Sequence, residues 1–310
     1  MDAYIEQLPQ QMVQGLSLGG IYALIAVGYT MVYAVLFMLN FAHGEIYMIG
    51  GFAGWWTLSL LTRNQWPLIN GFVLIFFMIV MAIMVAACVG MTVERIAYRP
   101  LRKSPRINLL LSALGVSLFL QYAVLTFQGP EPRFLSSYAL IPESVRIFYM
   151  GGVVISFIRV LVMVISFVFL ALILVFIKTT RAGKAMRATA QDREAATLMG
   201  IDTDRIIVLV FLIGSALGGA AGTLAGLLFT QLDYASGLQA GLKGFTAAVL
   251  GGMGSVSGAL MGGIILGLIE EAATLFIPAA YRDAVAFAVL VLVLIFRPRG
   301  LMGEKIVEKV

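Results

Sequence analysis

Long apolar runs without charge are the feature that most restricts how this chain can fold. Residues 12–37, 67–93 and 107–128 form three such runs, and none of them holds an acidic or basic residue. A helix needs about 20 apolar residues to cross a bilayer, whereas a barrel strand needs about ten with alternating polarity. The runs here are too long and too uniform for strands. Because a backbone in lipid must pair its own polar groups, helical spans are predicted.

The overall composition indicates the same class of protein. Of the 310 residues, 61% are hydrophobic and 12% are charged, and the mean hydropathy is +0.98. A soluble domain is nearer half apolar and a quarter charged. The net charge of +5 is not interpreted as nucleic-acid binding, because basic residues in a membrane chain mainly set its orientation. Cys88 is the only cysteine, which excludes an internal disulfide.

The expected fold is an all-α polytopic membrane protein with about eight transmembrane or re-entrant helical segments, forming one domain over residues 1–310. The sequence before the first run has no basic residue. It therefore lacks the charged start of a cleavable signal peptide, and the first run is expected to remain as a span. The expected segments are 12–37, 46–62, 67–93, 107–128, 158–177, 206–232, 244–269 and 279–296.

Basic residues set the expected orientation. The loops 94–106 and 178–205 and the tail after residue 296 hold five, six and four Lys or Arg, which is 15 of the 21 in the chain. Such residues concentrate in cytoplasmic loops. We therefore expect these three segments inside, and the N-terminus and the loop 129–146 outside.

The segment 244–269 holds eight glycines and decides on which side the tail lies. A continuous span would place the basic tail outside, whereas a broken or re-entrant element keeps it inside. Glycine can interrupt a helix at membrane depth where protein covers the backbone, so the broken element is favoured over a glycine-rich packing helix. Small residues four apart also predict close helix packing. They are Gly218, Gly222, Gly226, Gly258 and Gly262, with Gly263 and Gly267 as a further pair.

Polar residues interrupt the apolar sequence at "NFAHGE", residues 40–45. The stretch holds Asn40, His43, which is the only histidine, and Glu45, the only acidic residue between Glu6 and Glu94. A break between two helical spans is expected here, at or just within the cytoplasmic side. Two interpretations stay open: hydrogen bonds that hold a turn, or side chains that line a translocation path or gate.

The loop 178–205 predicts a short helix outside the membrane. Residues 184–199 are rich in Ala, Met, Lys, Arg and Glu, which favour helix. Gly200 is suited to the left-handed position at a helix C-terminus. The helix is either a solvated connector or a docking element for another subunit.

Other classes of protein have weaker support. An intramembrane serine protease would have to use "GVS" at 115–117 with His43, which are few and common residues. Residues with metal-ligand spacing and a G-x-x-x-x-G-K-[ST] phosphate loop are absent from the sequence. A gradient-driven secondary transporter could couple an ion through Glu45, Glu270 or Glu271. All three lie near ends of apolar runs, where solvation at the interface is the simpler account.

Several stretches carry a family resemblance. "EAATLMG" (194–200) fits the EAA-x-x-x-G loop of ABC importer permeases, although the downstream Ile-x-Leu-Pro is absent. "GLSLGGIYALIAVGYTMVYAVLFMLNFAHGEIYMIGG" (15–51) resembles the first spans of LivH-type permeases of branched-chain amino acid ABC importers. "RAGKAMRATAQDREAATLMGIDTDR" and "GFTAAVLGGMGSVSGALMGGIILGLIE" (244–270) resemble their cytoplasmic loop and penultimate segment. The resemblance covers essentially the whole chain.

The resemblance implies a function and a set of partners. The chain would be a permease in a bacterial or archaeal cytoplasmic membrane, with a LivM-type sister permease, two ATPase subunits and an external binding protein that delivers leucine, isoleucine or valine. ATP would be used by the ATPases, so no cofactor is expected in this chain, and no nucleic-acid partner. The coupling loop would act through Glu194, Ala195, Ala196 and Gly200. A related permease for urea or short amides is the alternative.

Overall fold

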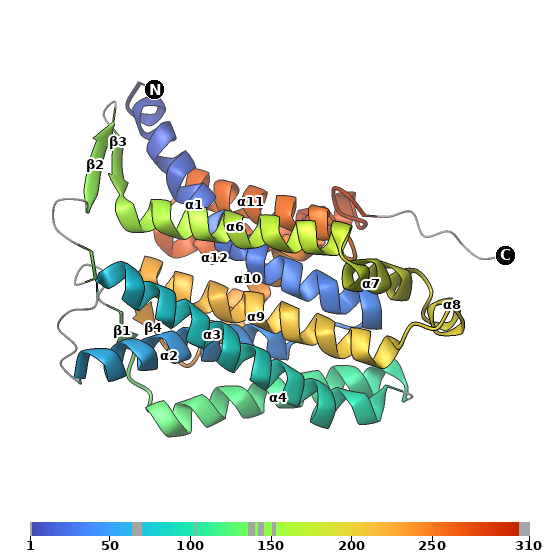
Figure 1. The fold of residues 1–310 in the computed structure, drawn as a ribbon. Helices are drawn as coiled ribbons and strands as arrows, with labels where there is room; N and C mark the ends of the chain where they lie inside the picture. Colours follow the sequence, from blue (N-terminus) through green and yellow to red (C-terminus); the bar gives the residue numbers. More distant parts are fainter. Residues whose placement is uncertain are drawn as a thin grey trace.

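The computed structural model describes residues 2–63, 70–102, 104–135, 140–141, 146–150 and 153–303. The described chain is a bundle of helices that run roughly along one common direction (Figure 1). The predicted all-α polytopic fold is confirmed. The helices are α1 (Asp2–Leu36), α2 (Ala42–Arg63), α3 (Gly71–Val93), α4 (Arg106–Gln128), α6 (Phe157–Thr179), α7 (Arg181–Gln191), α8 (Arg193–Leu198), α9 (Thr203–Phe229), α10 (Ser236–Gly251), α11 (Val256–Ala273) and α12 (Arg282–Phe296).

Seven helices in the described residues are long and apolar enough to cross a membrane. They are α1, α4, α6, α9, α11, α3 extended by its continuation to Leu101, and α12 with the short turn before it. The two remaining long helices, α2 and α10, pack within the same bundle. The expected second segment corresponds to α2, and the expected 244–269 segment is divided between α10 and α11.

Short elements mark the two ends of the bundle. β1 (Arg133–Phe134) pairs antiparallel with β4 (Gln231–Leu232), and β2 (Ile147–Met150) pairs with β3 (Val153–Ser156). All four strands lie at the end where the N-terminus lies, whereas α7 and α8 lie at the opposite end (Figure 1). We call these the strand end and the α7–α8 end.

A continuation of α3 brings the first basic loop to the α7–α8 end. After Val93 the helix continues as a π-helical turn, η1 (Glu94–Tyr98), and a 3-10 turn, η2 (Arg99–Leu101). Arg99 and Arg102 both form ion pairs with Asp204, in the first turn of α9. The two basic loops therefore lie together at one end of the bundle, and the positive-inside rule predicts that this end faces the cytoplasm.

The glycine-rich element is broken, as predicted. α10 ends at Gly251, and α11 begins at Val256 after Gly252 and Gly254, which have φ angles of +108° and +97°. Few side chains tolerate such φ values, so glycine at these positions permits the turn. The Ser255 hydroxyl then accepts the Gly258 N–H at 3.1 Å and caps α11.

The two halves of this element form an antiparallel helical hairpin. Gly251 contacts Gly258, and Gly262 contacts Ala247. On another side of α11, Gly267 packs against Gly19 of α1. The hairpin returns the chain toward the strand end, so α12 carries the tail to the other end. There the N–H groups of Leu301 and Met302 donate to the carbonyls of Leu250 and Gly251, both at 2.9 Å.

Candidate functional site

The "NFAHGE" stretch is a break between helices, and it lies deeper in the bundle than the sequence predicted. α1 ends at Leu36, and Phe37 adopts a left-handed φ of 52°. The chain then turns back, so that the first turn of α2 lies beside Gly28 of α1. Gly28 is two helical turns before the end of α1, which is a depth of about 12 Å. The first turn of α2 is therefore inside the bundle and not at its cytoplasmic edge.

His43 fills a space that two glycines leave open. Its side chain is 1% exposed, and its ring packs edge-on against Tyr29 with the centroids 4.7 Å apart. A Cβ atom at Gly28 would lie 2.5 Å from the imidazole, and one at Gly218 would lie 3.3 Å from it. The ring hydrogen-bonds the main chain of Ile25, while Nε2 has no partner among the described residues. Gly218 therefore packs against the histidine, which refines its predicted role in helix packing.

Glu45 is a buried carboxyl group with one satisfied oxygen. Its residue is 1% exposed, and Oε1 accepts a hydrogen bond from the Ser117 hydroxyl at 3.3 Å. Oε2 lies against Gly237 of α10 and has no hydrogen-bond partner in the described chain. A buried carboxyl group at membrane depth without a cationic partner is costly. This cost favours a functional role over a purely structural one.

Asn40 has a structural partner at its side-chain oxygen, while its Nδ2 has no partner among the described residues. Its Oδ1 accepts a 2.7 Å hydrogen bond from the Tyr98 hydroxyl, and its carbonyl accepts the His43 N–H at 3.0 Å. Asn40 thus ties the break to η1. The serine protease interpretation is not supported, because Ser117 hydrogen-bonds Glu45 and not His43, so the serine and the histidine do not form a catalytic pair.

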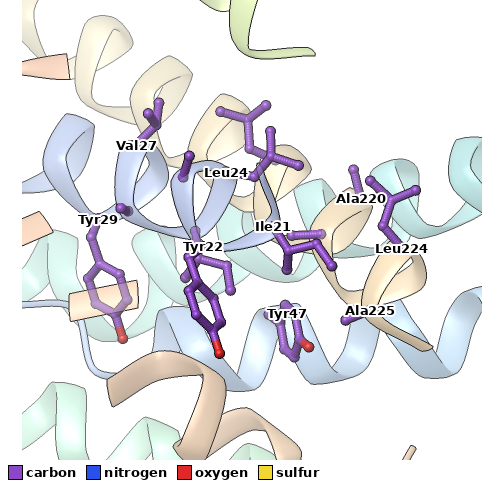
Figure 2. Close-up of a cluster of buried hydrophobic side chains, with 14 of the residues drawn as sticks. Ile21, Tyr22, Leu24, Val27, Tyr29, Tyr47, Ala220, Leu224 and Ala225 are labelled. Carbon is purple, nitrogen blue, oxygen red and sulfur yellow. The ribbon is translucent and has the colours of Figure 1, made fainter. Parts of the chain in front are cut away.

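Backbone contacts join α1, α2 and α10 around His43. Tyr29 projects from the same side of α1 as Tyr22 (Figure 2), and its hydroxyl hydrogen-bonds the Gly44 main chain. A space of about 10 Å³ is present beside Tyr29 and Gly237, which is about the least that can hold one water molecule. We call this closely packed region the polar layer. Its residues are Tyr29, His43, Gly44, Glu45, Gly237 and Gly241.

The prediction of a single helix at 184–199 is wrong. The structure has two helices, α7 and α8, separated at Asp192, which is extended with φ −155° and ψ 108°. Its carboxylate accepts the N–H groups of Glu194 and Ala195 at 3.0 Å, so it starts a new helix. The sequence prediction missed this because it considered helix propensity and did not consider capping. Gly200 does have the predicted left-handed conformation, with φ +83°.

The two alanines of the α7–α8 segment, residues 181–200, have different environments. Ala195 is exposed, like Glu194 beside it, whereas Ala196 is 4% exposed and packs within the chain. Of the two alanines through which the coupling loop was expected to act, only Ala195 is therefore accessible to a partner at the surface. Leu198 and Met199 are 88% and 82% exposed. The outer face of α8 and of the turn after it thus exposes two large apolar side chains, a feature typical of docking surfaces.

An ion-pair network connects this segment to the bundle. Arg193 of α8 and Arg102 both contact Asp204, at 3.2 and 2.6 Å, and Arg102 also pairs with Glu94. Burial lowers the pKa of the Arg102 guanidinium, and the carboxylates of Glu94 and Asp204 oppose that shift. Tyr98, on the same η1 turn as Glu94, hydrogen-bonds Asn40. Sequence reasoning missed this network because its members are up to about a hundred positions apart.

Glu270 and Glu271 are buried, and the expectation that they are solvated at an interface is wrong. Glu270 is 0% exposed and accepts hydrogen bonds from the Tyr22 hydroxyl at 2.9 Å and from Lys243 at 3.2 Å. Glu271 pairs with Arg282 at 2.9 Å. Buried charges of this kind are stable only when paired. These pairs hold α10, α11 and α12 together, which weakens the case for either glutamate as an ion-coupling site.

The fold and the site define a multi-pass integral membrane protein with a polar layer inside its helical bundle. The family described as "Branched-chain amino acid transport system / permease component" matches residues 11–294. The chain therefore belongs to this permease family.

Three relatives match nearly the whole chain. It is 43% identical over 305 residues to the high-affinity branched-chain amino acid transport system permease protein BraD of Pseudomonas aeruginosa. It is 40% identical over 305 residues to the permease protein LivH of Escherichia coli K12, and 40% over 310 residues to LivH of Salmonella typhimurium. In each comparison 97% of both chains is covered. The predicted LivH-type resemblance is confirmed.

Proposed function

We propose that this chain is the permease subunit of an ABC importer that moves leucine, isoleucine and valine across the cytoplasmic membrane of a bacterium or archaeon. The observation that carries the proposal is the identity of 40–43% over 97% of the chain to permeases named for branched-chain amino acid transport. A LivM-type permease, two ATPases and an external binding protein complete the importer. The ATPases use ATP, and this chain acts as one transmembrane domain with a coupling loop at 178–205.

The polar layer acts as a gate in this proposal. It closes the space between α1, α2 and α10 through close backbone contacts, which a small shift of α10 would open. His43 and Glu45 both keep one polar atom unpartnered within the described chain. Such atoms can hydrogen-bond water or substrate once the layer separates. Asn40 holds the turn through Tyr98, and its Nδ2 is likewise without a partner among the described residues.

The α7–α8 segment is the proposed contact for the ATPases. It lies at the end of the bundle that the positive-inside rule assigns to the cytoplasm, and its outer face is exposed. Movement of α8 would be transmitted through Arg193 and Asp204 to Arg102, and from η1 to Asn40 beside the polar layer. These contacts form a contiguous physical route of the kind that can carry coupling between distant sites.

The first prediction concerns the source of energy. Liposomes that contain the complete importer are expected to take up radiolabelled leucine only with ATP inside and the binding protein outside. The chain alone, under a proton or sodium gradient, is expected to take up none, because the energy of the proposed importer comes from ATP, which this chain, without a phosphate-binding loop, leaves to its partner subunits. Leucine uptake by the chain alone would instead support a secondary transporter. Uptake of urea but not leucine by the complete importer would favour the related amide permease.

The second prediction concerns His43. His43→Ala is expected to lower leucine uptake per assembled complex by about tenfold, a change of about 1.4 kcal/mol in the rate-limiting step. His43→Gln, which keeps a donor near the Ile25 carbonyl, is expected to recover part of the rate. The measurement is initial uptake normalised to purified complex. If His43→Ala yields less folded protein but normal uptake per complex, the residue only holds the turn.

A further inference from the structure

The bundle also contains a cavity that is separate from the proposed gate and large enough for a small molecule. A cavity of about 390 Å³ lies between α1, α2, the end of α9 and the first half of α10. Small-molecule sites commonly have volumes of about 300–1,000 Å³, with apolar walls and a few polar groups. This cavity matches that description. Its lining includes Ile21, Ile25, Tyr47, Leu232, Asp233 and Gln239.

The position of the cavity suits a substrate that arrives from outside. Leu232 belongs to β4, so the cavity adjoins the strand end of the bundle (Figure 1). On α1 the lining residues are Ile21, Tyr22 and Ile25, which lie one to two turns before Tyr29 of the polar layer. Figure 2 shows Tyr22 and Tyr29 projecting from the same side of α1. The cavity therefore lies directly on the outer side of the proposed gate.

Lys243 lies in one wall of the cavity, and its charge is already paired with carboxylates of the chain. Its ammonium group pairs with Glu270 at 3.2 Å and with Asp283 at 2.7 Å, and it lies 5.6 Å from the centre of the Tyr22 ring. Two carboxylates and an aromatic face already satisfy this cation. We therefore do not assign Lys243 to a ligand, and we regard it as a support that fixes α10 against α11 and α12.

Asp233 is the charged group of the cavity that is still available. Its Oδ1 accepts the Ala235 N–H at 2.8 Å at the start of α10, and Oδ2 has no hydrogen-bond partner among the described residues. No cation pairs with Asp233 in the part of the chain that the structure describes. The carboxylate therefore offers a site for an ammonium group.

Hydrogen-bond donors and an apolar wall complete the lining. The Tyr47 hydroxyl and the Gln239 amide line the same cavity, and neither forms a side-chain hydrogen bond within the described residues. Both can donate to a carboxylate. Ile21, Ile25 and Leu232 provide branched aliphatic surface, which favours a side chain of the same kind.

We propose that this cavity is a substrate site of the permease itself for a zwitterionic amino acid with a branched aliphatic side chain. Asp233 binds the α-ammonium group, Tyr47 and Gln239 receive the α-carboxylate, and the isoleucines contact the side chain. This inference rests on the proposed function and adds a second selective site behind the external binding protein. The polar layer then holds the bound amino acid until the gate opens.

The first test uses the complete wild-type permease complex without its binding protein. Leucine in the millimolar range is expected to raise the melting temperature of the purified complex, because a ligand stabilises the state that binds it. D-glucose at the same concentration is the control and is expected to cause no shift. No leucine-dependent shift in the wild-type complex, with no saturable binding of radiolabelled leucine, would overturn the site.

The second test uses two variants in the reconstituted importer. Asp233→Asn keeps the acceptor for the Ala235 N–H but removes the charge, and leucine uptake per complex is expected to fall about tenfold. Ala240→Leu fills the cavity and is expected to reduce leucine uptake more than alanine uptake. Leu292→Phe, half exposed on the neighbouring helix α12 and outside both the cavity and the polar layer, is the control and is expected to transport normally.

The outcomes separate this inference from the proposed function. If the wild-type importer moves leucine and both cavity variants match it, the site is wrong and the proposed function stands. If the wild-type importer moves no branched-chain amino acid, the proposed function fails. A loss of uptake in Leu292→Phe equal to that in Ala240→Leu would also overturn the site, since it would indicate that added bulk anywhere in this part of the bundle disturbs transport.

Discussion

Ala195→Trp is expected to release the ATPase subunits from the permease and to abolish uptake. Ala195 lies on the exposed outer face of α8, between the exposed Glu194 and the apolar pair Leu198 and Met199. A bulky ring there would overpack a docked surface at a cost of about 1–3 kcal/mol. This corresponds to about a 5- to 150-fold loss of affinity. The measurement is recovery of the ATPases with tagged permease, together with leucine uptake.

A matched control separates docking from folding. Ala195→Ser keeps a small side chain and is expected to bind the ATPases normally. Ala196→Trp is not a docking variant, because Ala196 is buried within the chain and the change would disturb α8 itself. If Ala195→Trp retains the ATPases and the hydrolysis stimulated by the loaded binding protein, the α7–α8 segment is only a connector.

The spans were predictable because each carries its own signal. Apolar runs such as 107–128 correspond closely to α4 (Arg106–Gln128), since a helix in lipid needs only length and hydropathy. The break in the glycine-rich element was also predictable, because Gly252 and Gly254 occupy positions of positive φ that other residues rarely adopt. The left-handed Gly200 has the same explanation.

Features that depend on tertiary contacts were not predictable from the sequence. The depth of the "NFAHGE" stretch depends on Phe37, whose positive φ turns the chain back into the bundle, and nothing in a phenylalanine indicates such a conformation. The burial of Glu270 depends on Tyr22, which is 248 positions away. The roles of Asn40, His43 and Glu45 stay proposals that only the variants can test.

In the α7–α8 segment, capping of a helix by an aspartate outweighs the helix propensity of the neighbouring residues. Residues 184–199 favour helix one by one, yet Asp192 accepts two N–H groups from the following turn and so stops one helix and starts another. Aspartate competes for backbone donors in this way, which explains its preference for N-cap positions. Because the chain changes direction at Asp192, the outer face of α8 points away from the bundle, and a partner can reach this face.

Glu94→Ala is expected to lower the folding stability of the permease more than the other single substitutions do. Glu94 is 0% exposed, and its partner Arg102 has a side chain that is only 5% exposed. Removal of one partner from a buried pair leaves an uncompensated charge, which costs about 3–5 kcal/mol. Asp204 remains as a second partner for Arg102, but it is half exposed and cannot replace the buried carboxylate fully. The measurement is the unfolding midpoint of the purified permease in detergent.

A double variant tests whether this loss comes from the stranded charge. Glu94→Leu with Arg102→Met removes both charges and keeps apolar volume, so it is expected to recover much of the lost stability. Uptake is expected to stay low in the double variant, because Arg102 no longer joins Asp204 and α8 to η1. Stability equal to wild type in Glu94→Ala would contradict the buried pair. Normal uptake in a stable double variant would show that coupling follows another route from α8 to the polar layer.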